Sequence, residues 1–80
     1  MPKRTKSYKL DLHGVFHSEV FEIVDKFVGE CVINGVTDFE IVTGHSREMQ
    51  RLVQEVLSDY KLKGEKPLHN PGTLIVKIFG

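Results

Sequence analysis

The 80-residue sequence has one cysteine and no tryptophan, and no apolar run approaches the roughly 20 residues that a membrane-spanning helix needs. A single cysteine, Cys31, can form no internal disulfide and cannot build a thiolate metal site alone. The basic N-terminus has no apolar stretch behind it, unlike a secretory signal. The sequence therefore predicts a cytoplasmic protein, without a membrane partner, whose fold depends on its hydrophobic core.

The charge of the chain is balanced but unevenly distributed. There are 11 Lys and Arg against 11 Asp and Glu. Four basic residues precede the first acid: Lys3, Arg4, Lys6 and Lys9. Residues 11–80 hold seven basic and eleven acidic side chains, so any basic surface must come from the N-terminus or from a local cluster. We expect residues 1–7 to form a basic, disordered tail and residues 8–80 to form one domain.

The first half of the domain reads as a strand followed by a helix. Residues 8–12 alternate between apolar and polar side chains, which is the period of a half-buried strand. The helix behind it is expected to take Ser18 as its N-cap and to stop at Asn34 and Gly35. Its apolar stripe recurs at helical spacing: Val20, Phe21, Val24, Phe27, Val28, Cys31 and Val32.

The second half adds a strand over residues 39–43 and a helix with Ser46 as its N-cap. The apolar residues of this helix follow the pattern i, i+3, i+4, i+7, i+8, i+11: Met49, Leu52, Val53, Val56, Leu57 and Tyr60. A weak edge strand over 66–70 and a last strand over 73–79 complete the order β, α, β, α, β, β. This order predicts an α/β two-layer sandwich with two helices and a four-stranded mixed sheet whose first two strands are parallel.

Polar residues follow both of the strands that are expected to be parallel. They are Asp11, His13 and Gly14 after the first strand, and Thr43, Gly44, His45 and Ser46 after the second. Ligands of such sheets collect outside the carboxyl ends of the strands, so these residues are expected to meet at one edge. Asp11 and His13 share a strand face. The carboxylate could orient the imidazole for acid/base chemistry, with His45 serving the opposite proton transfer.

The start of the second helix suits a phosphate, because its free N–H groups carry the positive end of the helix dipole. Gly44, His45 and Ser46 lie there, and Arg47 and Arg51 share a helix face nearby. Structural roles stay open for the same residues. The carboxylate of Asp11 can bind a loop N–H, Ser46 can cap without a ligand, and the arginines can be a solvated face.

Metal binding is the competing chemistry at this edge. Asp11, His13, His45 and His69 are suitable ligand types, but no recognised spacing such as HExxH supports a site. No metal ligand and no cofactor is therefore assigned, and a requirement for a divalent metal stays open. His17 is expected in the loop before the first helix, while His69 either faces the site or is an ordinary edge residue.

These motifs resemble the small MutS-related (Smr) domain family. The family's first motif, LDLHG, stands unchanged at residues 10–14, and Glu19 falls at the family's usual acidic position. The second motif, of the form TGxGxHS, is represented by Thr43–Ser46 with the glycine between the two pairs missing. The resemblance covers Tyr8 to Phe79 and implies a fold similar to the C-terminal domain of bacterial translation initiation factor three.

The resemblance implies a nucleic-acid-binding endonuclease that cleaves or nicks a phosphodiester in DNA or RNA. Its implied catalytic residues are Asp11, His13 and His45, and its implied phosphate-binding residues are Gly14, Gly44, Ser46, Arg47 and Arg51. Some family members act on messenger RNA at stalled ribosomes, so a ribosome or another protein partner stays open. The alternative is a non-catalytic module of the same fold that binds nucleic acid or protein.

Overall fold

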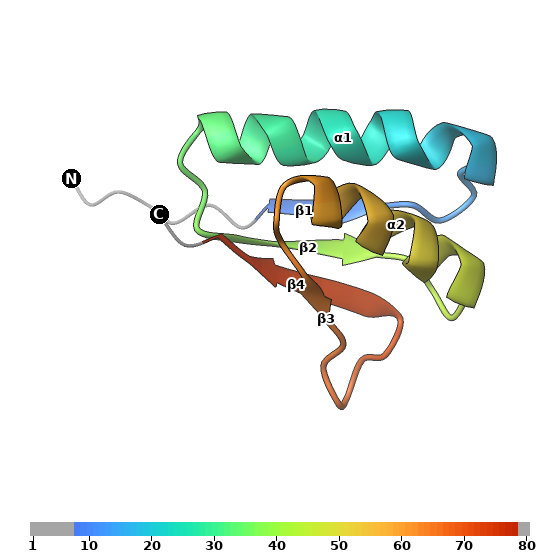
Figure 1. Cartoon of the computed structure of the whole chain (residues 1–80). Coiled ribbons are helices and arrows are strands. Elements are labelled where there is room, and N and C mark those ends of the chain that lie inside the picture. The colour runs from blue at the N-terminus through green and yellow to red at the C-terminus, as the bar shows by residue number, and fades with distance from the viewer. Residues whose placement is uncertain (1–7, 79–80) are drawn as a thin grey trace.

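The computed structural model describes residues 8–78. Its elements in chain order are β1 (Tyr8–Asp11), α1 (His17–Ile33), β2 (Asp38–Val42), α2 (Arg47–Asp59), β3 (Gly64–Glu65) and β4 (Thr73–Lys77). The four strands form one sheet in the order β1-β2-β4-β3, and the two helices pack against one another beside it (Figure 1). β1 and β2 are parallel, while β4 runs antiparallel to both β2 and β3. The predicted α/β fold with a mixed sheet is confirmed.

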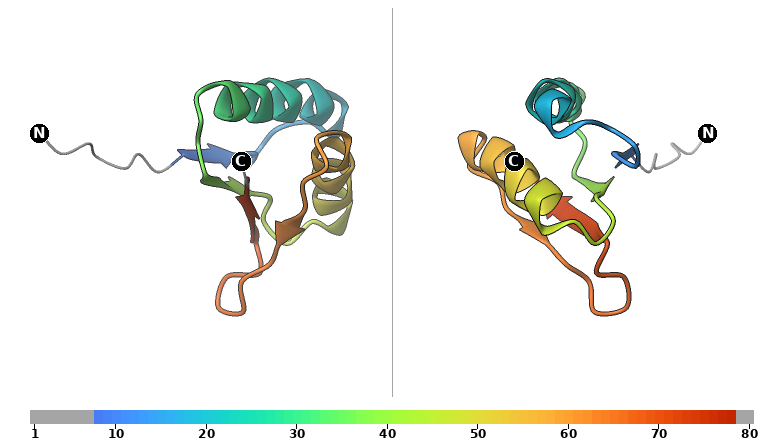
Figure 2. Two further views of the ribbon diagram at one scale, coloured as in Figure 1. Left: turned by 60° about the vertical axis from the view of Figure 1, so that its left-hand side comes forward. Right: turned by 90° about the vertical axis from the view of Figure 1, so that its right-hand side faces the viewer.

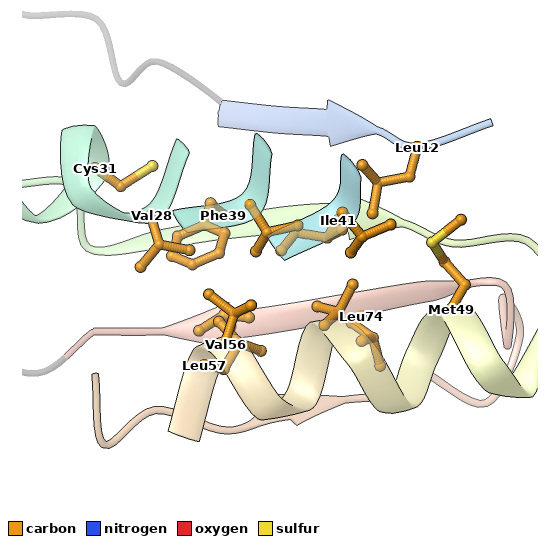
Figure 3. Packing of buried hydrophobic residues seen from close by; sticks show 13 residues of the cluster. Leu12, Val28, Cys31, Phe39, Ile41, Met49, Val56, Leu57 and Leu74 are labelled. Atoms are coloured by element: carbon orange, nitrogen blue, oxygen red, sulfur yellow. The ribbon is translucent and has the colours of Figure 1, made fainter. Parts of the chain in front are cut away.

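The core lies between the helices and one face of the sheet. The register pairs Phe39 with Val76 and Ile41 with Leu74, so all four side chains lie on the same face, and all are buried. Figure 3 shows Phe39, Ile41 and Leu74 beside side chains from both helices. The buried helix residues are Val20, Val24, Val28 and Cys31 on α1 and Met49, Val53, Val56 and Leu57 on α2. The predicted stripes are thus the core faces, except for Phe21 and Val32, which are 45% exposed on the flanks of α1.

Helix α1 begins earlier than the sequence indicated. Phe16 is its N-cap, without a side-chain capping bond, and His17 is the first helical residue. The predictions of Ser18 as N-cap and of His17 in the preceding loop were wrong, because the backbone closes the first turn by itself: the Glu19 N–H donates to the Phe16 carbonyl at 2.9 Å. Within residues 8–78, neither helix has the length and apolar character to cross a membrane.

The C-terminus of α1 follows the sequence. Gly35 has a φ of 72°, and its N–H donates to the carbonyl of Val32 while the N–H of Val36 reaches that of Cys31. These two bonds make a Schellman motif, which requires the left-handed residue that glycine supplies most easily. The predicted stop at Asn34 and Gly35 is confirmed.

Helix α2 is capped as predicted at its start and ends without a glycine. The Ser46 Oγ accepts a hydrogen bond from the Met49 N–H at 3.1 Å. At the other end, Lys61 N–H donates to Ser58 and Leu62 N–H to Leu57, the same two bonds as in α1. Lys61 takes the left-handed position with a φ of 61°. A side chain in this conformation carries a steric cost that glycine avoids.

The edge strand lies elsewhere than predicted. Residues 66–70 form no strand, and β3 consists of Gly64–Glu65. The Gln54 side chain fixes this position, because its amide binds both the N–H and the carbonyl of Gly64, at 3.1 and 3.0 Å. Pro67 has no N–H for a ladder, so the chain leaves the sheet and forms a projecting loop over residues 66–72 (Figures 1 and 2). The N-terminal tail predicted over residues 1–7, and Phe79 at the end of the last predicted strand, lie outside the described residues.

Candidate nucleic-acid interface

The carboxyl ends of β1 and β2 lie at one edge of the sheet, as their predicted parallel pairing requires. Asp11 pairs with Val42 in the register, and the Leu12 N–H donates to the Val42 carbonyl at 3.0 Å. The turn over residues 12–15 and the loop over residues 43–46 are therefore neighbours. Residues separated by about 30 positions in the sequence form one polar edge (Figure 1).

The turn after β1 is held by the Asp11 carboxylate. Its Oδ1 accepts a hydrogen bond from the backbone N–H of His13 at 2.9 Å. The Val15 N–H closes the turn on the Leu12 carbonyl, and Gly14 takes the positive φ of 79° in its third position. Of the roles the sequence left open for Asp11, binding of a loop N–H is the one observed. The His13 imidazole is exposed at the turn and makes no hydrogen bond within residues 8–78.

The loop after β2 is tied to the loop before β4. The N–H groups of Thr43 and Gly44 both donate to the carbonyl of Gly72 at 2.9 Å. The hydroxyl of Thr43 lies 3.3 Å from the same oxygen and 3.0 Å from the carbonyl of Gly44. Residues 66–72 therefore belong to the site. The local sequence Asn70-Pro71-Gly72 is typical of a turn, and it does not reveal the packing partner of Gly72.

Gln50 joins the loop after β2 to the loop before β4. This role was not predicted from the sequence. Its Nε2 donates to the carbonyls of Gly44 and Pro71, each at 3.2 Å, and its Oε1 accepts from Lys66 Nζ at 3.3 Å. The available signal was its position one helical turn after Ser46, which places both residues on the same side of α2. Gln50 fixes the arrangement of the loops rather than presenting a reactive group.

The basic and imidazole side chains at this edge differ in what they contact. His45 and Arg47 are exposed, and their side chains make no hydrogen bond or ion pair within the described residues. Arg51 instead pairs with Glu48 and Glu55 of its own helix, each at 2.6 Å. Its hydrogen bond holds the pKa of Glu48 below the usual value. A phosphate at Arg51 would have to compete with two carboxylates, whereas the Arg47 guanidinium has no partner among residues 8–78.

The remaining histidines do not complete a metal centre. His69 is exposed in the 66–72 loop, and His17 is the first residue of α1. Across residues 8–78, no three side chains of the His, Cys, Asp or Glu type are grouped as a metal ion would require. The edge therefore combines exposed imidazoles, the Arg47 guanidinium, which is unpaired within the described part of the chain, and the start of a 13-residue helix. These groups suit a phosphate backbone.

Comparison with known proteins places the chain in a family. The Smr domain model matches residues 10–69. The fold is similar to the crystal structure of the Smr domain of Thermus thermophilus MutS2, with a TM-score of 0.70 and 18% identity over 94% of this chain and 99% of that one. It is also similar to YdaL, a stand-alone small MutS-related protein from Escherichia coli, with a TM-score of 0.66 and 17% identity over 94% of this chain and 69% of that one. No curated protein matches the sequence. With three quarters of its residues matched by the family, this chain belongs to the Smr domain family.

Proposed function

We propose that this chain binds nucleic acid at the edge formed by residues 12–15, 43–46 and 66–72, and that it cleaves a phosphodiester bond there. The observation that carries the proposal is the parallel register of β1 and β2, which places His13 and His45 on adjacent loops. Membership of the Smr family supports it, because members of this family bind nucleic acid and some cleave it.

Phosphate binding rests on the start of α2. The Ser46 hydroxyl satisfies the N–H of Met49, and the N–H groups of Arg47 and Glu48 have no acceptor within the helix. They add to the positive end of the helix dipole, next to the unpaired guanidinium of Arg47. Gly44, with its φ of 69°, lets the backbone turn into the helix beside His45. A phosphate here would meet N–H donors, an arginine and an imidazole together.

Cleavage requires one group that accepts a proton and one that donates it. In the proposed reaction, one histidine takes the proton of the attacking hydroxyl as its oxygen forms a new P–O bond. The original P–O bond then breaks, and the leaving oxygen receives a proton from the other histidine. His13 is assigned as base or acid, and His45, with the helix N-terminus, stabilises the phosphate charge and serves the opposite transfer. Asp11 acts through the turn, because its carboxylate binds the His13 backbone rather than the imidazole.

The contact of Asp11 with the His13 backbone favours a second candidate, a non-catalytic module that binds nucleic acid at this edge. A carboxylate that orients an imidazole would contact its ring, and Asp11 Oδ1 contacts the His13 N–H instead. His13 would then be a recognition residue on a rigid turn.

The two candidates are separated by measuring binding and cleavage on the same substrates. Labelled single-stranded RNA, duplex DNA and branched DNA are incubated with the protein, with and without a divalent metal. Cleavage should be almost lost in His13→Ala and partly lost in His45→Ala, while binding measured by fluorescence anisotropy persists. Lys26→Ala, on the outer face of α1, is the control. Unchanged cleavage by His13→Ala excludes the acid/base assignment, and binding without cleavage by the unmodified protein establishes the binding module.

A further inference from the structure

A groove lined by apolar and basic side chains lies at the opposite end of the molecule from the loops over residues 12–15 and 43–46. Here the C-terminal ends of α1, α2 and β4 surround a groove of about 540 Å³. Its apolar part consists of Val32, Tyr60, Leu62, Ile75 and Ile78, and its charged residues are Lys61, Lys63, Lys77 and Glu65. All three lysines are exposed. The groove thus combines an apolar floor with a rim of net positive charge.

The outward faces of the two helices are mainly acidic. The outward faces of the helices carry seven exposed carboxylates: Glu19, Glu22, Asp25, Glu30, Glu48, Glu55 and Asp59. They carry only three cations, Lys26, Arg47 and Arg51. On the sheet face away from the helices, Glu40 of β2 is the register partner of Lys9 of β1, and Asp38 of β2 is the partner of Lys77 of β4. Away from the start of α2, the carboxylates of the helices repel a polyanion, whereas the lysine rim of the groove attracts it.

A line of lysines connects the groove to the candidate interface. The segment after α2 carries Lys61 and Lys63 into the groove, continues through β3, and places Lys66 against Gln50. β3 pairs antiparallel with β4, so this segment runs back toward the edge where β1 and β2 end. Lys66 begins the 66–72 loop, so the exposed lysines of this segment lead from the groove to the candidate interface.

We infer that this groove is a second binding subsite, which takes the part of a single nucleic-acid strand that extends beyond the loops. The strand passes along β3, with its phosphates at Lys66, Lys63 and Lys77 and a base against the apolar floor. A basic rim with an aromatic and apolar platform is the arrangement that binds single strands without reading sequence. The inference rests on the proposed function, since the strand must also engage the 12–15 and 43–46 loops.

The test compares oligouridines of about 4 and about 16 nucleotides, which bracket the site sizes of single-strand-binding folds. The longer one should bind the unmodified protein more tightly, because only it reaches from the loops to the groove. The double variant Lys63→Gln/Lys77→Gln should lose that gain and flatten the slope of log affinity against log salt by about 1.4. It should bind the short oligonucleotide like the unmodified protein. Lys9→Gln/Lys26→Gln, on β1 and α1, is the charge-matched control and should keep the gain.

The outcomes separate the subsite from the function on which it rests. Suppose that the short oligonucleotide binds while the longer one gains the same affinity in the unmodified protein and the double variant, or gains none in either. Each of these results overturns the groove and leaves the loop interface standing. If neither oligonucleotide binds, the groove is overturned, and the loop interface is decided by the measurements on duplex and branched DNA. An acidic peptide of alternating Glu and Leu is titrated in parallel. If it shifts the amide signals of Leu62 and Ile75 and the long oligonucleotide does not, the groove is a peptide site and the inference is wrong.

Discussion

Gly72 lies directly against Gly44, so that a Cβ at position 72 would stand 3.3 Å from both the Cα and the carbonyl carbon of Gly44. The Gly72 carbonyl accepts the N–H groups of Thr43 and Gly44 at the same point. The position of the loop after β2 is therefore set by a glycine 28 residues later in the chain. The geometry of His45 and of the start of α2 depends on this contact.

Replacing Gly72 with alanine tests the contact. The added Cβ presses on backbone that cannot rotate away, so Gly72→Ala should lower the free energy of unfolding by about 1 kcal/mol and shift the amide signals of Gly44 and His45. Gly29→Ala is the matched control. Its Cβ would meet the hydroxyl of Tyr60 at 3.3 Å, the end of a flexible side chain far from the loops. Unchanged loop signals and stability in Gly72→Ala would show that the loops are not tied in this way.

Two substitutions of Asp11 can show whether this residue acts as a hydrogen-bond acceptor or through its negative charge. Asp11→Asn keeps an Oδ1 that can accept the His13 N–H, whereas Asp11→Ala loses the bond and loosens the turn. If Asp11 acts through the turn, Asp11→Asn should retain most cleavage or binding and Asp11→Ala should lose much of it, with a stability loss of about 1 kcal/mol. Rates and urea unfolding of the two variants provide the measurement. Equal loss of cleavage in both would assign the role to the negative charge instead.

Lys61 occupies a position that glycine would fill with less strain. Lys61→Gly should raise the free energy of unfolding by up to about 1 kcal/mol, since the left-handed conformation costs roughly that much for a residue with a Cβ. For a domain of this size the melting temperature should rise by about 4 °C or more per kcal/mol. Lys63→Gly serves as the comparison, because Lys63 does not have a positive φ, and it should give no increase. A lower melting temperature for Lys61→Gly would contradict the argument.

The contact between Tyr60 and Asp25 joins α2 to α1 and gives the stability an alkaline limit. The Tyr60 hydroxyl donates to Asp25 Oδ1 at 2.9 Å, which raises the pKa of Tyr60 above its usual value. The folded chain therefore keeps this proton to higher pH than the unfolded chain. The stabilisation is complete below about pH 10, the unfolded pKa, and is lost as pH rises through the folded pKa.

Urea unfolding of the unmodified protein and of Tyr60→Phe between about pH 8 and 11 measures this effect. The Tyr60→Phe variant should be less stable at the lower pH and should lose less stability on going to the higher one. Tyr8→Phe, which removes the other tyrosine, should keep the alkaline loss. Parallel curves for the unmodified protein and Tyr60→Phe would show that the hydrogen bond makes no pH-dependent contribution.

The elements themselves were readable from the sequence, because the rules that form them act over a few residues. The spacing of Met49, Val53 and Val56 predicts the buried face of α2. Ser46 caps and Gly35 terminates as expected, since each acts on backbone three or four positions away. The motifs after β1 and β2 were also predicted to meet at one edge, and they do, because parallel pairing brings the two strand ends together.

The contacts that shape the site were decided by tertiary structure. The register of β2 with β4 brings Gly72 to Gly44, and only then can Gln50 hold both loops. The packing of Gln54 on Gly64 moved the edge strand away from residues 66–70. Local pattern carries little information about such contacts, because they join residues 6 to 29 positions apart whose meeting depends on how whole elements dock. The sequence thus determined the elements and the edge, and the docking of those elements determined which groups at that edge are held and which are exposed.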